Sequence, residues 1–266
     1  MVNNLNIAHY PGTFLPTIGG VELIVHNLAN EQVLLGHNVS VITHKKSKDF
    51  IINNDIRTNY KIISPLQYSF GISRNINKYI PSINPLMGWQ IKYFQLKNRF
   101  DIWHFNYINE NSYCILNILK EMRVPTVVTY RGADIQISEK YNYGKRRASN
   151  IDKMIRKNII NYRCLTATSE SVKKEYIKLG VRSENIKIIP NFIDYNKFES
   201  CSENIDKIKL KYKIDRGKII VLSVGRNHPK KGYDVIPSII KELLKYRSDF
   251  IWIIVGKDCE RIYEKA

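Results

Sequence analysis

Short apolar runs alternate with stretches of helical periodicity along most of this chain, and that alternation restricts the fold more than any other feature. The run Leu5–Tyr10 predicts a buried strand, and a stretch of helical spacing begins at Val21. Further strands are predicted at Val39–Thr43, Tyr60–Ile63, Asp101–Phe105, Thr126–Tyr130, Cys164–Thr168 and Ile186–Ile189. Further helices are predicted at Pro85–Arg99 (on the spacing of Leu86, Trp89, Tyr93 and Leu96), Asn111–Met122, Asn150–Tyr162 and Ser171–Leu179. Strands and helices that alternate in this way predict an α/β fold, with a parallel sheet and helices on both faces.

A second unit of the same kind follows a charged, weakly patterned stretch. Its predicted elements are a strand at Lys218–Val224, a helix at Asp234–Tyr246 and a strand at Phe250–Val255. We therefore expect an N-terminal domain at 1–195, a linker at 196–217 and a partial C-terminal domain at 218–266. One strand-helix-strand unit has exposed sheet edges and little core. It is expected to pack on something else or to be the first part of a larger domain.

Composition excludes several classes of protein. The longest apolar runs are strand-sized, well short of the roughly 20 residues that cross a membrane. The first ten residues lack the basic start and apolar core of a signal peptide. The cysteines lie far apart, without a CxxC pair or metal-ligand spacing: Cys114, Cys164, Cys201 and Cys259. A cytoplasmic protein with free thiols and no metal is predicted.

The charge balance is strongly basic, with 42 Lys and Arg against 24 Asp and Glu and a formal net charge of +18. Such an excess indicates an anionic partner: nucleic acid, an acidic membrane surface or a phosphate-bearing substrate. It also fits a biased codon composition, because the lysines are scattered among many Asn and Ile residues. The densest basic runs, Lys45–Lys48 and Lys145–Arg147, fit either a solvated surface or an anion-facing patch.

The loops at the carboxyl ends of the strands hold the candidate sites, because ligands of a parallel sheet bind there. After the first strand, Gly19 and Gly20 open a helix, and bare backbone N–H groups at the positive end of a helix dipole suit a phosphate. A tight turn that needs glycine explains the pair as well. Glu22 follows directly and is a candidate for the substrate pocket.

The loop after the strand at Lys218–Val224 carries two cations. Arg226 can bind phosphate oxygens through its fork of N–H groups, and Lys231 can add a point charge. Two cations on one loop fit a diphosphate whose charge grows as it leaves. The alternative is a solvated basic turn.

Two other strand ends carry titratable side chains. His104 either faces the ligand edge or is a hydrogen-bonded core histidine. Arg131 and Asp134 follow the strand at Thr126–Tyr130. They either hold substrate hydroxyls or phosphate, or form an ion pair that fixes the loop.

These loops, in this order, resemble the retaining glycosyltransferases of family 4, which have the two-domain GT-B fold. Five fragments over nearly the whole chain carry the resemblance. They are Gly19–Glu22 with Gly36–Val39 ("GGVE…GHeV"), Asp101–His104 ("DivH"), Val124–Thr129 with Gly132–Asp134 ("vPvvxT…GxD"), Ile189–Asn191 with Ile193, Asp194 and Phe198 ("iPNGvD…F"), and Val224–Arg226 with Pro229 and Lys231–Asp234 ("vGRlxpxKGxd"). Each fragment alone is weak evidence, and the ordered set is strong.

The resemblance implies a GT-B-like architecture, with a complete Rossmann-like acceptor-side domain and the beginning of a Rossmann-like donor-side domain. It implies hexosyl transfer from a nucleotide-sugar to a saccharide or lipid-linked acceptor, with retention and without a metal, in cell-surface polysaccharide or glycolipid synthesis. Arg226 and Lys231 would hold the donor diphosphate, which Gly19 and Gly20 also approach. Glu22, Arg131 and Asp134 would line the substrate pocket.

Three departures from the family pattern bear on this reading. Many members have a second, catalytic histidine in the "DivHxH" strand, and this chain has Asn106 there. Asn106 cannot act as a general base but can hydrogen-bond a sugar hydroxyl, and His104 matches the first histidine. The position after "iPN", usually glycine, is Phe192. The family's donor-side "E-x7-E" motif has no match before Ala266, and a truncated donor domain is therefore expected.

Three functions follow as alternatives. The first is a glycosyltransferase, whose N-terminal domain would dock peripherally on the anionic inner face of a membrane. The second is a non-catalytic remnant or a partner-dependent binding subunit, because the donor motif is missing. The third is a nucleic-acid binder, which rests on charge alone, without zinc-finger spacing or an RNP-like sequence.

Overall fold

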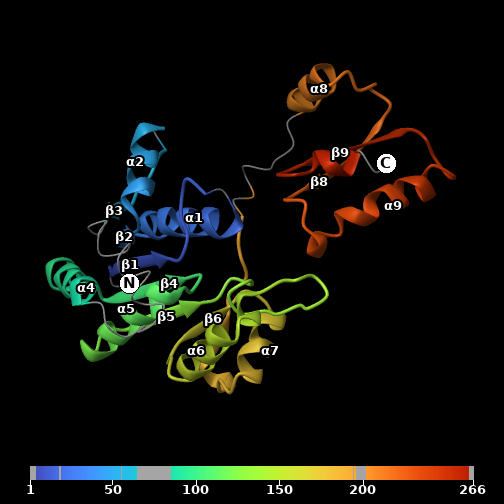
Figure 1. The fold of residues 1–266 in the computed structure, drawn as a ribbon. Helices are drawn as coiled ribbons and strands as arrows, with labels where there is room; N and C mark the ends of the chain where they lie inside the picture. Colours follow the sequence, from blue (N-terminus) through green and yellow to red (C-terminus); the bar gives the residue numbers. More distant parts are fainter. Residues whose placement is uncertain are drawn as a thin grey trace. The chain divides into compact units, whose positions relative to one another are not determined.

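The computed structural model describes residues 4–17, 19–54, 56–64, 85–193, 195 and 202–263. The chain divides into two compact units, Met1–Phe192 and Ile193–Ala266, and each unit has its own sheet (Figure 1). The predicted domain boundary at residue 195 stays a prediction. The stretch predicted as a linker, 196–217, contains helix α8 (Ser202–Lys211).

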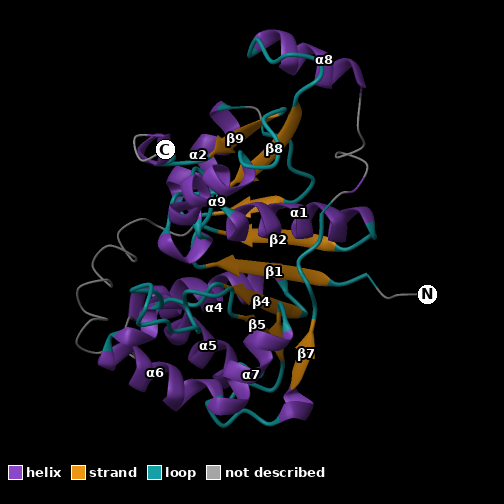
Figure 2. Ribbon diagram, turned by 90° about the vertical axis from the view of Figure 1, so that its right-hand side faces the viewer, coloured by secondary structure: helices purple, strands orange, loops and turns teal. Residues whose placement is uncertain are grey.

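The first unit is built on a seven-stranded sheet in which every described strand pair is parallel. In the order of the sheet, the strands are β3 (Lys61–Ile63), β2 (Asn38–Ile42), β1 (Asn6–Pro11), β4 (Ile102–Asn106), β5 (Thr126–Thr129), β6 (Leu165–Ala167) and β7 (Ile186–Ile188). Strand β1 is an inner strand, paired with β2 on one side and β4 on the other (Figure 2). The strands that follow β1 in sequence are first added on one side of it (β2, β3) and then on the other (β4 to β7). The carboxyl ends of β1 and β4 therefore form a topological switch point.

Two apolar layers cover the two faces of this sheet, because successive side chains of a strand point to opposite faces. Ile7 and Val41 pack in one layer with Val25 of helix α1 (Gly20–Leu34) and with helix α2 (Lys45–Asn53). Ala8 and Phe105 pack in the other layer. The helices of this second layer are α4 (Pro85–Asn98), α5 (Glu110–Glu121), α6 (Ser149–Ile159) and α7 (Glu170–Lys178). The predicted α/β sheet with helices on both faces is therefore confirmed.

Local sequence fixes where two of these helices begin. Asn109 and Ser112 form a reciprocal capping box at the start of α5, each side chain bonding the other's backbone N–H. The Ser169 hydroxyl accepts a hydrogen bond from the Val172 N–H at the start of α7. Both helices start at the carboxyl edge of the sheet, so these caps also fix the loops that surround the candidate site.

Helix α4 occupies the predicted stretch, but its large side chains do not face the core. Trp89, Tyr93 and Leu96 are 61%, 44% and 71% exposed, whereas Met87 and Ile91 are fully buried. The helix carries apolar residues on two faces. The helical spacing used in the prediction belongs to Trp89, Tyr93 and Leu96, which lie on the face turned away from the sheet. Periodicity identifies a face of a helix without saying which face covers the sheet.

The exposed lysines of the first basic run fit both predicted alternatives, whereas the centre of the second run fits neither. The run Lys45–Lys48 begins helix α2, which buries Ser47 and leaves Lys46 and Lys48 exposed. In the second run, Arg146 is 6% exposed; its Nε lies 2.7 Å from Asp152 Oδ1 and its Nη1 donates to a backbone carbonyl. The centre of that run is therefore a buried ion pair, neither a solvated surface nor an anion-facing patch.

The second unit consists of two parallel strands with a small core. The strands are β8 (Ile219–Val224) and β9 (Phe250–Val255). Between them along the chain lie the short helical turns η4 (Pro229–Lys231) and η5 (Tyr233–Val235) and helix α9 (Ile236–Leu243), and helix α10 (Glu260–Tyr263) follows β9. The core holds Tyr233, Ile236, Cys259 and Ile262. Leu222 and Val224 are 59% and 70% exposed, so the sheet is covered only in part.

None of the described helices combines the length and the apolarity that crossing a bilayer requires.

Candidate functional site

Four strand ends of the first unit meet in one hydrogen-bond network centred on Asn106. Asn106 ends β4 and is fully buried. Its Oδ1 accepts a hydrogen bond from Arg131 Nη2, and its Nδ2 lies 3.4 Å from His9 Nδ1. Arg131 Nη1 donates to Asn191 Oδ1 at 2.8 Å. The network thus joins the carboxyl ends of β1, β4, β5 and β7, and both ends of the Asn106 amide are occupied within the protein.

Arg131 and Asp134 fix their loop without an ion pair between them. Asp134 is 1% exposed and accepts backbone N–H groups of Arg131 (2.8 Å), Gly132 (2.9 Å) and Ile108 (3.0 Å). Burial raises the pKa of Asp134 to about 6, against the lowering effect of these hydrogen bonds. Burial also lowers the pKa of Arg131, whose Nε lacks a hydrogen-bond partner among the described residues. The predicted ion pair is therefore wrong, and the carboxylate is held by backbone donors instead.

Two histidines lie beside this network, with ring centroids 5.2 Å apart. His9 Nε2 lies 2.6 Å from Gln32 Oε1, and His104 Nε2 lies 2.7 Å from Thr129 Oγ1. Burial lowers the pKa of His9 to about 4 and that of His104 well below its usual value, and the charge of Arg131 lowers both further. Both rings are therefore neutral at neutral pH.

The glycine-rich loop lies at the start of α1. Gly19 is extended, and Gly20 begins the helix. A Cβ on Gly20 would meet nothing within 4 Å, whereas a Cβ on Gly19 would lie 2.7 Å from Glu22 Oε2. Glu22 is 5% exposed and accepts a hydrogen bond from Thr13 Oγ1 at 2.5 Å. The carboxylate of Glu22 therefore braces the loop internally.

Three residues of this edge were not singled out as site residues from the sequence: His9, Asn191 and Gly12. The clearest case is Gly12, where a Cβ would lie 1.9 Å from Tyr107 O. Its N–H donates to Asn106 O at 2.7 Å, and its carbonyl accepts from Asn109 Nδ2 at 3.1 Å. Only a glycine allows the loops after β1 and β4 to approach this closely. The available signal was a glycine directly after a buried strand.

The second unit carries its candidate cations on a braced loop after β8. Arg226 and Lys231 are exposed, and no described carboxylate forms an ion pair with either. Asn227 ties the loop to the one after β9, through N–H to Lys257 O and Nδ2 to Asp258 O, both at 2.9 Å. A Cβ on Gly256 would lie 1.7 Å from Gly225 O, so the two loops touch backbone to backbone.

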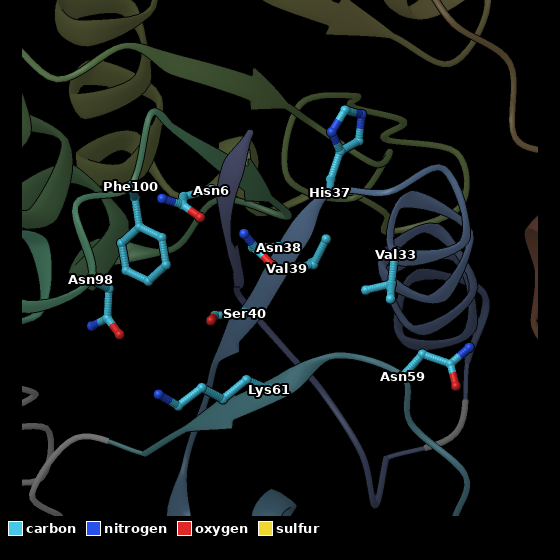
Figure 3. Close-up of a pocket in the computed structure, with 10 residues that line it drawn as sticks. All are labelled: Asn6, Val33, His37, Asn38, Val39, Ser40, Asn59, Lys61, Asn98 and Phe100. Atoms are coloured by element: carbon cyan, nitrogen blue, oxygen red, sulfur yellow. The ribbon is translucent and has the colours of Figure 1, made fainter. Parts of the chain in front are cut away.

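A polar pocket of about 310 Å³ lies at the opposite, amino edge of the first unit's sheet (Figure 3). Its lining residues are Asn6, Val33, His37, Asn38, Val39, Ser40, Asn59, Lys61, Asn98 and Phe100. It contains none of the predicted site residues. In the described part of the chain, no group of three or more His, Cys, Asp or Glu side chains is placed to hold a metal ion.

One curated relative comes from yeast. The chain is 24% identical over 254 residues to the phosphatidylinositol N-acetylglucosaminyltransferase GPI3 subunit of Saccharomyces cerevisiae (strain YJM789). The match covers 94% of this chain and 52% of the yeast protein, so the chain spans about half the length of that relative.

Two solved structures share the fold. Anabaena HepE in complex with UDP and glucose matches with a TM-score of 0.64 and 15% identity, over 98% of this chain and 64% of that one. Sucrose-phosphate synthase of Thermosynechococcus elongatus matches with a TM-score of 0.63 and 17% identity, over 95% of this chain and 62% of that one.

The family assignment rests on a match to most of the chain. The model of Glycosyltransferase Family 4 matches residues 18–197. That range takes in Gly19 and Gly20, the Asp134 loop, and the Asn106, Arg131 and Asn191 members of the hydrogen-bond network, while His9 lies before it. The resemblance inferred from ordered sequence fragments and the match of the family model thus agree, and the chain belongs to glycosyltransferase family 4.

Proposed function

We propose that this chain takes part in transferring a sugar from a nucleotide-sugar donor to a saccharide or lipid-linked acceptor, with retention, in cell-surface polysaccharide or glycolipid synthesis. Membership of family 4 supports the reaction class. The HepE structure contains UDP and glucose, and the name of the yeast relative describes N-acetylglucosamine transfer involving phosphatidylinositol. The HepE complex supports a nucleotide-sugar donor, and the name of the yeast relative supports a lipid acceptor.

The observation that carries the proposal is the pair of exposed cations on the loop after β8. Arg226 and Lys231 have no ion-pair partner among the described residues, yet their loop is tied to the one after β9. A fixed loop with unneutralised cations suits a diphosphate, because charge-assisted hydrogen bonds are short and strong. As the bond between the anomeric carbon and the phosphate oxygen breaks, the cations stabilise the growing charge on the leaving group.

The first unit supplies the acceptor side in this proposal. Bare backbone at Gly19 and Gly20 suits a phosphate, and Glu22, Arg131 and Asp134 shape the substrate pocket by fixing its loops. Burial lowers the pKa of His104 well below its usual value, so the ring is a weak base, and its Nε2 is bonded to Thr129; the Asn106 amide is not basic and is engaged, so neither is assigned as a general base. The acceptor hydroxyl instead gives its proton to a donor phosphate oxygen while its oxygen bonds the anomeric carbon on the same face. We propose that no metal takes part.

Nucleoside diphosphate binding tests the donor site directly. Calorimetry with UDP on the full chain is expected to show binding that weakens about tenfold or more in the variant Arg226→Ala, Lys231→Ala, since each charge-assisted hydrogen bond is worth about 1.5–3 kcal/mol. The matched control is Arg216→Ala, Lys241→Ala, which removes the same charge from exposed positions of the same unit. Equal loss in both variants, or none in the first, contradicts the site. Binding that needs added Mg²⁺ contradicts the metal-free proposal.

A partner-dependent binding subunit or a non-catalytic remnant is the second candidate. The yeast relative is named as a subunit, and this chain spans 52% of it. The β8–β9 sheet also exposes Leu222, Val224 and Val255, which another polypeptide could cover. Sugar transfer by the purified, mass-verified 266-residue chain would reject this candidate. Donor binding without transfer, restored by a partner protein, would favour it.

We also propose a cytoplasmic location with peripheral contact to an anionic membrane, where lipid-linked acceptors are presented. The net charge of +18 supports this contact.

A further inference from the structure

An exposed stripe of large side chains runs along the outer face of helix α4. The stripe consists of Trp89, Tyr93 and Leu96, which are 61%, 44% and 71% exposed. The rings of Trp89 and Tyr93 are stacked, with centroids 5.8 Å apart and an interplanar angle of 13°. The opposite side of the helix is already anchored, since Met87 and Ile91 are fully buried in the core of the first unit. The stripe is therefore not needed to hold α4 on the sheet.

Such a stripe is costly in water. Tryptophan is highly buried on average, and contiguous exposed apolar surface marks a site of interaction. Tyr and Trp are also the side chains enriched where an apolar phase meets water, because each combines an apolar ring with a polar tip. Side chains at positions 89, 93 and 96 lie three and four residues apart, so they share one face.

The charges around the stripe select the partner. Helix α4 contains no acidic residue, and Lys92 and Lys97 are exposed on it. Lys97 Nζ lies 3.2 Å from Tyr93 Oη and 5.5 Å from the centre of its ring, so its cation is held at the edge of the stripe. Basic residues beside Trp and Leu on one helix are the pattern of a segment that lies in the interface of an anionic bilayer.

We propose that the Trp89–Tyr93–Leu96 stripe of α4 is the surface by which the first unit docks on an anionic lipid bilayer. The rings and Leu96 enter the interfacial region, and Lys92 and Lys97 remain among the headgroup phosphates. The helix lies along the surface and does not cross it. This assignment rests on the proposed membrane contact and is independent of the transfer reaction.

The experiment is vesicle flotation of the full chain, with vesicles of equal parts phosphatidylglycerol and phosphatidylcholine or of phosphatidylcholine alone. The variant Trp89→Gln, Leu96→Gln is expected to lose at least tenfold in partitioning to anionic vesicles. The matched control is Leu34→Gln, Leu35→Gln at the C-terminal end of α1, where the two leucines are 69% and 73% exposed. The variant Lys92→Gln, Lys97→Gln is expected to lose about fivefold per lysine, and the control Lys153→Gln, Lys174→Gln much less.

The fluorescence of Trp89 also measures how deeply its ring enters the bilayer. Brominated lipid is expected to quench its emission in the variant Trp252→Phe, in which the other remaining tryptophan, Trp103, is fully buried. Circular dichroism of every variant checks that the fold persists.

Several outcomes would overturn the assignment. They are absence of anionic vesicle binding by the unaltered chain, equal loss in the α1 control, and equal loss in the lysine control, which would indicate diffuse electrostatic attraction. Concentration-dependent self-association abolished by Trp89→Gln, Leu96→Gln, without vesicle binding, would assign the stripe to a second copy of the chain. UDP calorimetry on the same variants separates these failures from failure of the proposed transfer, because the stripe variants should bind UDP unchanged.

Discussion

Two arginines that each follow a strand of a parallel sheet have opposite surroundings. Arg131, after β5, is partly buried and donates to Asn106 and Asn191. Arg226, after β8, is exposed and has no ion-pair partner in the described part of the chain. The first fixes a loop by hydrogen bonds within the protein, and the second leaves its hydrogen-bond donors available to a ligand. An arginine at a carboxyl edge can therefore either fix a loop or bind a ligand, and the burial of its side chain decides between these two roles.

The same contrast extends to the two units. The first encloses its sheet between two apolar layers, whereas the second covers two strands with a core of four buried residues. Buried apolar area is the main source of stability. A large apolar side chain of the first unit should therefore contribute more to the free energy of unfolding than the same side chain in the second unit.

Truncating one tryptophan in each unit is expected to give the largest difference in the free energy of unfolding. Trp103 is fully buried and donates to Gln95 Oε1 at 2.7 Å, while Trp252 is partly buried and donates to Ser223 Oγ at 3.0 Å. Trp103→Ala is expected to cost about 3–5 kcal/mol of unfolding free energy. Trp252→Ala should cost about 1–2 kcal/mol, because part of its ring already meets water. Urea unfolding with segment-resolved hydrogen exchange measures both, and equal costs would contradict the contrast.

Acid should weaken the first unit through its buried histidines. The folded pKa of His9, about 4, lies below its unfolded value, so the unfolded chain binds more protons between about pH 4 and 6.5 and stability falls as pH falls through that window. His104 acts in the same direction, and Asp134, with its raised pKa, opposes both. His9 alone contributes about 3 kcal/mol across the window. His9→Gln should flatten a plot of unfolding free energy against pH, and an unchanged slope would contradict the assignment.

Two glycines of the same loop should respond oppositely to a methyl group. Gly12→Ala puts a Cβ 1.9 Å from Tyr107 O and is expected to cost about 2 kcal/mol or more. Gly20→Ala meets nothing within 4 Å and should leave stability within about 0.5 kcal/mol, or raise it. Thermal unfolding of both variants measures the difference. A Gly20→Ala variant that is stable but binds UDP more weakly would support backbone contact with phosphate there.

The smallest effect concerns the arginines themselves. Arg131→Gln removes hydrogen bonds from a buried network and is expected to cost about 1–2 kcal/mol. Arg226→Gln should change unfolding free energy by less than about 0.5 kcal/mol. Chemical denaturation distinguishes the two, and a large cost for Arg226→Gln would show that its loop depends on the cation.

Much of the fold was predictable because the helical spacing or the apolar run of an element lies within its own segment of the sequence. Strand β9 matches its predicted bounds, Phe250–Val255, and the helices of the first unit's second layer lie within a few residues of theirs. Helix α2 was missed because its start is a run of lysines, whose apolar partners come only later in the helix. The outer face of α4 could not be identified, because burial depends on where the crossover between β3 and β4 places the helix.

The site was predictable in location and not in its internal contacts. The carboxyl-edge rule pointed to Arg131 and Asp134, and the family resemblance pointed to Asn106; the structure places all three at that edge. Neither could show that Asp134 bonds backbone N–H groups, or that His9 and Asn191 join a network spanning 182 positions of sequence, 191 − 9. Such contacts are properties of the sheet order, which brings distant strand ends together.

The position of β1 between β2 and β4 has a consequence for how the chain folds during translation. β1 pairs with β2 soon after it is made, but its other neighbour, β4, follows much later: the Asn6 N–H bonds Asp101 Oδ2, 95 residues along the chain. Pairings this distant in sequence slow folding, because the intervening loop must close first. During translation one edge of β1 remains open until β4 (Ile102–Asn106) has emerged, so the earliest described strand gains its second neighbour only when the chain has grown past residue 102.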